Sequence, residues 1–139
     1  MESFLVHNRL QSELLKTGSH SEEELASARE RILSGSWPES MKSDILESAM
    51  SLGPLGVGLA VRSSAVDEDG KSHSFAGQYA TFLNAVASTE ILKSIQACWA
   101  SWFSFEATVY RRKRGLQRAG GMAVLLQKQV HASASGVLF

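Results

Sequence analysis

Apolar residues recur at helical spacing through the first third of the chain. The spacing predicts a helix over residues 2–17, a second helix that follows Ser21 and closes at Gly35, and a third that starts at Pro38 and ends at Gly53. Ser21 precedes three glutamates, which is an N-cap signal because its hydroxyl can accept a free amide proton while the acids face the positive helix end. These helices carry no cluster of reactive side chains, so we interpret them as packing elements.

The periodicity changes after Pro54, where short apolar runs indicate strands. The four strand candidates are "VGLAV" (57–61), "YATFLNA" (79–85), "MAVLLQKQV" (122–130) and "GVLF" (136–139). Helical spacing returns in "STEILKSIQACWASWF" (88–103) and again through Tyr110 into "RRKRG". The order of helices, hairpin, helices and strands predicts an α+β fold with a largely antiparallel sheet.

Composition excludes several classes of protein. Fourteen Lys plus Arg balance fourteen Asp plus Glu among 139 residues, so no net charge attracts nucleic acid or an anionic membrane. The single cysteine, Cys98, fits a reducing compartment, and the N-terminus lacks the pattern of a signal peptide. No apolar run approaches the roughly 20 residues that span a bilayer. We therefore expect a soluble, cytoplasmic chain without nucleic-acid or membrane partners.

Arg62 is the first candidate for chemistry. It directly follows the apolar strand "GLAV", so we expect it at a strand end, at the mouth of the sheet. A guanidinium there needs an anionic partner, which is either an acid of the next loop (Asp67, Glu68 or Asp69) or an external phosphate that its planar fork can bind. Gly77 in "FAGQ" would allow close approach of a ligand, and Thr81 would project toward the same mouth.

Other conspicuous side chains have structural interpretations. The basic run "YRRKRG" lies at a helix C-terminus, where cations complement the helix dipole and commonly face solvent. Trp99, Trp102 and Phe103 share helical spacing with Cys98, so we expect them in the core. The four histidines are scattered, and neither a zinc pattern nor a hydrolase or P-loop motif occurs in the sequence.

The segment "LLQKQV" (125–130) has two interpretations. Its polar residues fit an edge strand with one wet face. They also fit a hinge strand whose free backbone N–H and C=O groups pair with a purine edge.

Four blocks in order resemble the nucleotide-binding domain of the pyruvate phosphate dikinase and phosphoenolpyruvate synthase family, which rifampicin phosphotransferases also carry. The blocks are "AVRSSAVDEDGKSHSFAGQYATFLNA", "ACWASWFSFEATVYR", "LLQKQV" and "SGVLF". The resemblance covers residues 60–139 and implies a partial ATP-grasp subdomain, with a helical N-terminal segment at 1–55 and a nucleotide-binding core at 56–139.

The resemblance also implies site residues and partners. Arg62 would contact the ATP phosphates, Gly77 would admit them, and Thr81 would donate a nearby hydroxyl. Gln127 and the backbone through Gln129 would form the adenine hinge, although Gln129 replaces the methionine that the family commonly has there. In the family a phosphoryl group passes from ATP, with Mg²⁺, to a histidine on a separate domain and then to pyruvate or another acceptor.

Several parts of the family pattern have no counterpart in the chain. These are the upstream glycine-rich loop with its lysine, the metal-binding acid, the phosphohistidine domain and the acceptor domain. The chain also stops at the apolar "SGVLF". We therefore expect a truncated piece of a phosphotransferase that is inactive alone, with the metal ligand outside this chain; the alternative is a non-catalytic remnant or interaction module.

Overall fold

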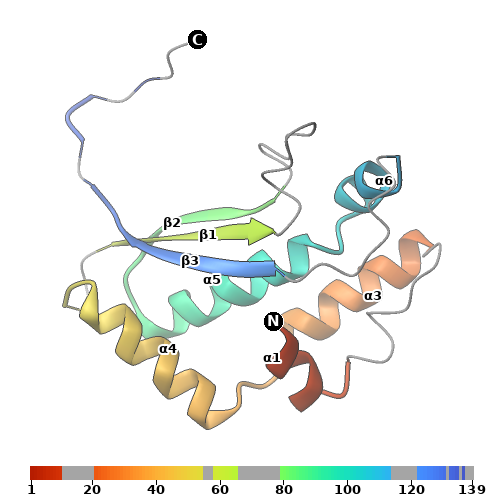
Figure 1. Cartoon of the computed structure of the whole chain (residues 1–139), viewed down its shortest axis with the longest axis horizontal. Coiled ribbons are helices and arrows are strands. Elements are labelled where there is room, and N and C mark those ends of the chain that lie inside the picture. The colour runs from red at the N-terminus through yellow and green to blue at the C-terminus, as the bar shows by residue number, and fades with distance from the viewer. Residues whose placement is uncertain are drawn as a thin grey trace.

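The computed structural model describes residues 1–10, 21–54, 58–65, 79–113, 122–130, 132–134 and 136. In this part of the chain the elements are α1 (Glu2–His7), α3 (Glu22–Leu33), α4 (Glu39–Ser51), β1 (Leu59–Ala65), β2 (Thr81–Ala85), α5 (Ser88–Ser101), α6 (Phe105–Lys113) and β3 (Met122–Lys128) (Figure 1). The predicted α+β class is confirmed.

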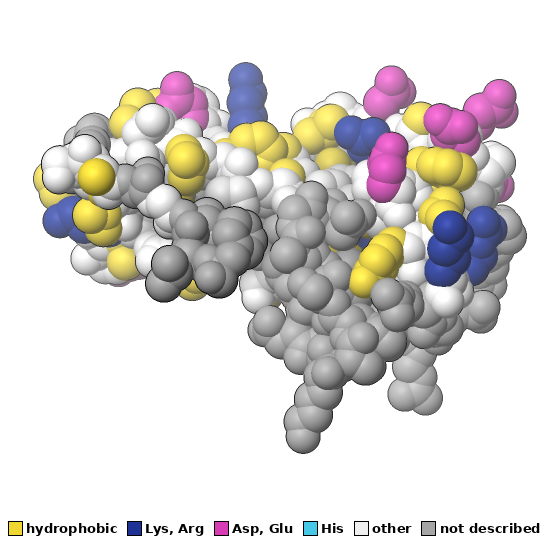
Figure 2. Space-filling view, turned by 90° about the horizontal axis from the view of Figure 1, so that it is seen from above, with side chains coloured by type: hydrophobic (Ala, Val, Ile, Leu, Met, Phe, Trp, Pro, Cys, Tyr) yellow, Lys and Arg dark blue, Asp and Glu magenta, His cyan; other side chains and the backbone are white. Residues whose placement is uncertain are grey.

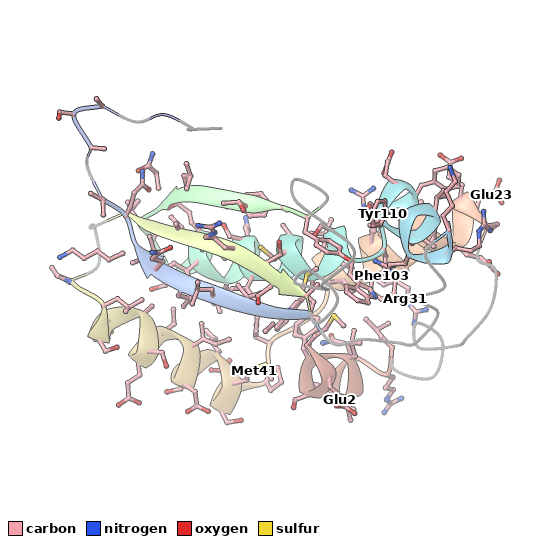
Figure 3. All side chains as sticks on the ribbon, turned by 45° about the horizontal axis from the view of Figure 1, so that its top comes forward. Glu2, Glu23, Arg31, Met41, Phe103 and Tyr110 are labelled. Carbon is pink, nitrogen blue, oxygen red and sulfur yellow. The ribbon has the colours of Figure 1, made fainter. Side chains whose placement is uncertain are left out.

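The three strands form an antiparallel sheet in the order β2-β1-β3. Helix α5 packs against one face of the sheet and contacts all three strands. In Figure 3 the sheet lies in front of α5, and no helix of the described residues covers the face toward the viewer. We call this second side the open face.

Side-chain alternation explains the two faces. Leu59, Val61 and Ala65 of β1 are buried toward the helices, whereas Arg62 and Ser64, which alternate with them, are exposed. An antiparallel sheet covered on one side has this pattern.

The N-terminal helices are attached to α5 by aromatic packing and by Gln96. Phe4, Trp37 and Trp99 pack with ring centroids 5.0–5.4 Å apart. The buried Gln96 amide donates to the carbonyls of Ile32 (3.0 Å) and Gly35 (2.8 Å), and its oxygen accepts from the Trp37 indole (3.1 Å). One side chain thus satisfies polar groups at the end of α3 and in the loop that follows it.

The helix starts agree with the sequence better than the helix ends. Ser21 forms the predicted cap as a full capping box, in which its hydroxyl accepts from Glu24 N–H and the Glu24 carboxylate accepts from Ser21 N–H. Pro38, the predicted first residue of the third helix, is the N-cap of α4, so the helix begins one residue later, at Glu39; it ends before Gly53 as predicted.

The prediction of one helix over residues 2–17 is wrong, because α1 ends at His7. Arg9 has a positive φ of 56°, Leu10 N–H donates to Leu5 C=O, and Arg9 N–H donates to Val6 C=O. This is a Schellman end, and the burial of both Leu5 and Leu10 supplies the apolar contact that accompanies it. Residues 11–17 lie outside the described part.

The described strands differ from the predicted ones at their ends, since β2 begins at Thr81 and not at Tyr79, and β3 ends at Lys128 and not at Val130. Strand β1 runs to Ala65, so Arg62 lies within the central strand and not at a strand end. The strand continues because Ser63 and Ser64 pair with Val124 and Ala123 of β3. The polar loop 66–78 and residues 137–139 of the fourth strand candidate lie outside the described residues.

Candidate functional site

Arg62 occupies the centre of the open face. Its register partners are Thr81 on β2 and Leu125 on β3. Residues directly opposite in an antiparallel sheet project to the same face, so these three side chains form one row across the sheet. All three are exposed. Gln127 lies in the neighbouring row, opposite Ala60 of β1, and is exposed as well.

The Arg62 guanidinium has no ion pair and no side-chain hydrogen bond within the part of the chain that the structure describes. Its candidate internal partners, Asp67, Glu68 and Asp69, lie outside that part, and so does Gly77. Among the described site residues, Arg62 and Thr81 are therefore the polar groups at the centre of the open face.

Strand β2 contains a bulge opposite the start of β1. The register shifts between Leu59 and Val61, and Asn84 adopts a positive φ of 59°, which asparagine tolerates better than most residues. Gln129 Oε1 accepts a hydrogen bond from Asn84 N–H at 2.9 Å. Gly58 fits here because a Cβ atom would lie 3.0 Å from Asn84 Oδ1.

Backbone pairing determines which groups of β3 remain available for a ligand. Gln129 N–H donates to Gly58 C=O at 3.0 Å, so these two residues are a hydrogen-bonded pair. Such pairs alternate along an antiparallel ladder, and Gln127 therefore also turns its backbone groups toward β1. The N–H and C=O groups of Leu126 and Lys128 point outward, to the edge of β3 that has no strand beside it among the described residues.

Arg111, Trp102 and Tyr79 contact one another close to the start of β2, and this group was not predicted from the sequence. Arg111 of the basic run is only 8% exposed, contrary to the prediction that the run faces solvent. Its guanidinium lies 4.1 Å from the centroid of the Trp102 ring and donates to Tyr79 Oη at 3.2 Å. Arg112 and Lys113 are exposed, as predicted. Helical spacing could have predicted this burial, because Arg111 follows the fully buried Ala107 by four residues and therefore lies on the same side of α6.

The remaining predictions concern the core, metals and membranes. Trp99, Trp102, Phe103 and Cys98 are buried as expected, and burial raises the pKa of the Cys98 thiol to about 12. The described residues contain no group of three or more His, Cys, Asp or Glu side chains that could hold a metal ion. None of the described helices combines the length and the hydropathy of a membrane span. Figure 2 shows acidic and basic side chains interspersed on the face in view, without a continuous basic surface among the coloured residues.

Comparison with known proteins gives matches in one family. All 139 residues match the family described as pyruvate phosphate dikinase, AMP/ATP-binding domain. The prodigiosin synthesizing transferase PigC of Serratia marcescens is 41% identical over 126 residues, which are 91% of this chain and 13% of that protein. A rifampicin phosphotransferase of Streptomyces sviceus is 51% identical over 81 residues, 58% of this chain and 9% of the relative.

The phosphoenolpyruvate synthase of Pyrococcus furiosus is 36% identical over 102 residues, 73% of this chain and 12% of that protein. The chain thus spans 13% or less of the length of these three relatives. The match over residues 1–139 includes the helical segment that the four sequence blocks left out. The chain belongs to the pyruvate phosphate dikinase AMP/ATP-binding domain family.

Proposed function

We propose that the chain supplies one wall of an ATP site in a phosphotransferase of the phosphoenolpyruvate synthase and pyruvate phosphate dikinase type. The observation that carries this proposal is the exposed guanidinium of Arg62, which has no ion pair among the described residues and lies at the centre of a sheet face that no described helix covers. A guanidinium fork matches phosphate oxygens bidentately and remains charged at all physiological pH values.

The phosphate end of the site is the row of Arg62 and Thr81. The hydroxyl of Thr81 is the group nearest in register to Arg62 on β2, and it can donate to a phosphate oxygen that the guanidinium holds. Gly77 stays a proposed member of this end. Mg²⁺ would shield the phosphate charge during transfer, and we expect its ligands outside this chain.

The base end of the site is the outer edge of β3. We propose that the adenine edge pairs with the outward backbone groups around Gln127 and Gln129, and in particular with the N–H and C=O of Lys128. Lys128 is three residues along β3 from the register partner of Arg62, about 10 Å at the rise of a strand. This separation leaves space for a ribose between the base and its phosphates.

Exposed apolar side chains on the open face support the proposal that a ligand covers this face when it binds. Leu125 is 53% exposed in the Arg62 row and Leu83 of β2 is 62% exposed. A nucleotide lying along the face would cover such side chains. In the proposed ATP-grasp arrangement, a second subdomain would close over the ligand from this side.

The phosphoryl acceptor belongs to other parts of such proteins. The relatives are named for different reactions, phosphoenolpyruvate synthesis and rifampicin phosphorylation among them. We propose that the phosphoryl group passes from ATP to a histidine of a separate domain and then to pyruvate or a similar small acceptor.

The hinge geometry predicts discrimination between purines. A C=O acceptor beside an N–H donor pairs with the N6 amino group and N1 of adenine, whereas inosine triphosphate presents an oxygen and an N1–H in their place. Because mismatched polar groups in a buried site cost about 1–3 kcal/mol, ATP should bind about 5- to 150-fold more tightly than inosine triphosphate.

Isothermal titration of the full-length gene product with ATP, adenosine and inosine triphosphate measures this difference. Saturable binding of ATP with the predicted preference supports the proposal. Absence of ATP binding would overturn it and favour the non-catalytic interaction module; equal affinity for both triphosphates would overturn the adenine hinge.

A further inference from the structure

We propose that Arg111 is a positioning residue for the phosphate end of this site and that it acts through Tyr79. The inference rests on the proposed ATP function, because it concerns the same row of residues. Arg111 itself lies on α6, outside the sheet, and is buried, so we expect it to act on the nucleotide only through Tyr79.

Arg111 is buried, and hydrogen bonds hold its guanidinium in place. Its guanidinium donates to Trp102 C=O at 2.7 Å, to Thr108 Oγ1 at 3.1 Å and to Tyr79 Oη at 3.2 Å. The planar fork therefore has a fixed orientation, set by two acceptors on the helical segment and by the face of the Trp102 ring. Through its hydrogen bond to the third acceptor, the guanidinium also restrains the Tyr79 hydroxyl.

Tyr79 is restrained by the Trp102 ring and by Arg111. Its ring is stacked on Trp102, with centroids 5.7 Å apart and an interplanar angle of 9°. It is 9% exposed. Ring stacking fixes the plane of the side chain, and the hydrogen bond from Arg111 fixes its direction within that plane.

Tyr79 is connected to the proposed phosphate end through Ala80 and Thr81, the next two residues of the chain. The next residue, Ala80, accepts hydrogen bonds from Ser63 N–H (3.2 Å) and Ser63 Oγ (3.0 Å), and its N–H donates to Ser101 Oγ (3.3 Å). The residue after it, Thr81, is the register partner of Arg62. A displacement of Tyr79 would therefore move the start of β2 against β1, in the row proposed to bind phosphate.

A purely structural role does not require an arginine here. Burying a cation costs free energy, and a well-packed apolar side chain of similar volume is often as stabilising as a buried charge. The guanidinium adds directional hydrogen bonds between α6, Trp102 and the start of β2. This is the contribution expected of a positioning residue.

The test compares ligands with and without phosphates. Tyr79→Phe removes only the hydroxyl and keeps the stacked ring, and Arg111→Met removes the fork at similar volume. Both variants should weaken ATP binding by about tenfold while adenosine affinity stays within about twofold, and the double variant should be no weaker than the single ones. Lys113→Met, at an exposed position of the same helix, is the matched control and should bind both ligands as the unchanged protein does.

Calorimetric titration of the full-length gene product gives both affinities, and thermal unfolding gives the stability of each variant. If ATP binds the unchanged protein but Tyr79→Phe weakens ATP and adenosine equally, or neither, the positioning role is wrong. If the unchanged protein does not bind ATP, the proposed function fails first and this inference fails with it.

Discussion

Two arginines of the chain carry the same charge in opposite surroundings. Arg62 stands on the open face with no partner among the described residues, and Arg111 is 8% exposed with three hydrogen-bond acceptors around it. The difference comes from phase, because strand alternation turns Arg62 outward and helical spacing turns Arg111 toward Trp102. Of the two guanidinium groups, Arg62 is the one that an incoming anion can reach.

The buried thiol of Cys98 gives a prediction at the same scale. Its pKa is raised by burial from the ordinary 9.0 to about 12, so the unfolded chain loses this proton at lower pH than the folded one. The contribution to stability is complete below pH 9 and falls as the pH rises from 9 toward 12. Relative to Cys98→Ala, the unchanged protein should lose about 1 kcal/mol of unfolding free energy between pH 7 and pH 10.

Urea unfolding of both proteins at the two pH values measures this loss, since the other titrating groups cancel in the difference. The native thiol should also resist iodoacetamide at neutral pH. A stability difference that stays constant with pH would show that the folded thiol ionises as readily as the unfolded one.

Individual side chains were predictable where one rule decided their place. Trp99 and Cys98 share the apolar stripe of α5, and both are buried. The rule that a basic run faces solvent wrongly predicted an exposed Arg111. The side chain is buried because it lies on the same side of α6 as Ala107. Gln129 could not be predicted to bind Asn84 N–H, since that contact depends on a bulge with no signal in composition.

At the scale of the elements, local signals decide several helix boundaries, whereas long-range pairing decides the length of β1. Ser21 and Glu24 define the beginning of α3 by themselves. The beginning of α5 has half of this arrangement, in which the Glu90 carboxylate accepts from Val86 and Ala87 N–H and its pKa is lowered by these bonds. Strand β1, by contrast, extends past Arg62 because β3 pairs with it, and the sequence of β1 alone could not reveal this.

Gln96 makes the attachment of α3 to α5 testable. In Gln96→Leu, the Trp37 indole N–H and the carbonyls of Ile32 and Gly35 lose their partner in a buried or half-buried place. We expect a loss of about 1–3 kcal/mol in unfolding free energy, because buried polar groups without partners are costly. Chemical denaturation followed by circular dichroism measures it.

Lys93→Leu serves as the control, since Lys93 is exposed on the same helix and the substitution is also to leucine. This control should change stability by less than about 0.5 kcal/mol. Equal stability of Gln96→Leu and the unchanged protein would show that the three hydrogen bonds contribute nothing net.

At the scale of the whole molecule, the described residues form a three-stranded sheet with helices on one face and no described helix on the other, open face. The helices bury the covered face in one apolar cluster that extends from Phe4 to Met122. The α+β class and the order of the elements followed from periodicity, because strands and helices differ in period. The open face did not follow, since it depends on the sheet order β2-β1-β3, and the register that aligns Arg62 with Thr81 is visible only in the fold.

The central claim is that Arg62 binds the phosphates of ATP, and its most direct test is the affinity of Arg62→Ala for ATP. A charge-assisted hydrogen-bonded contact contributes about 1.5–3 kcal/mol, so ATP affinity should fall about 10- to 150-fold while adenosine affinity is unchanged. Arg29→Ala, which removes an exposed arginine of α3, should bind ATP normally. Calorimetric titration of the full-length gene product provides the measurement. An Arg62→Ala variant that is folded and binds ATP as tightly as the unchanged protein would contradict the account.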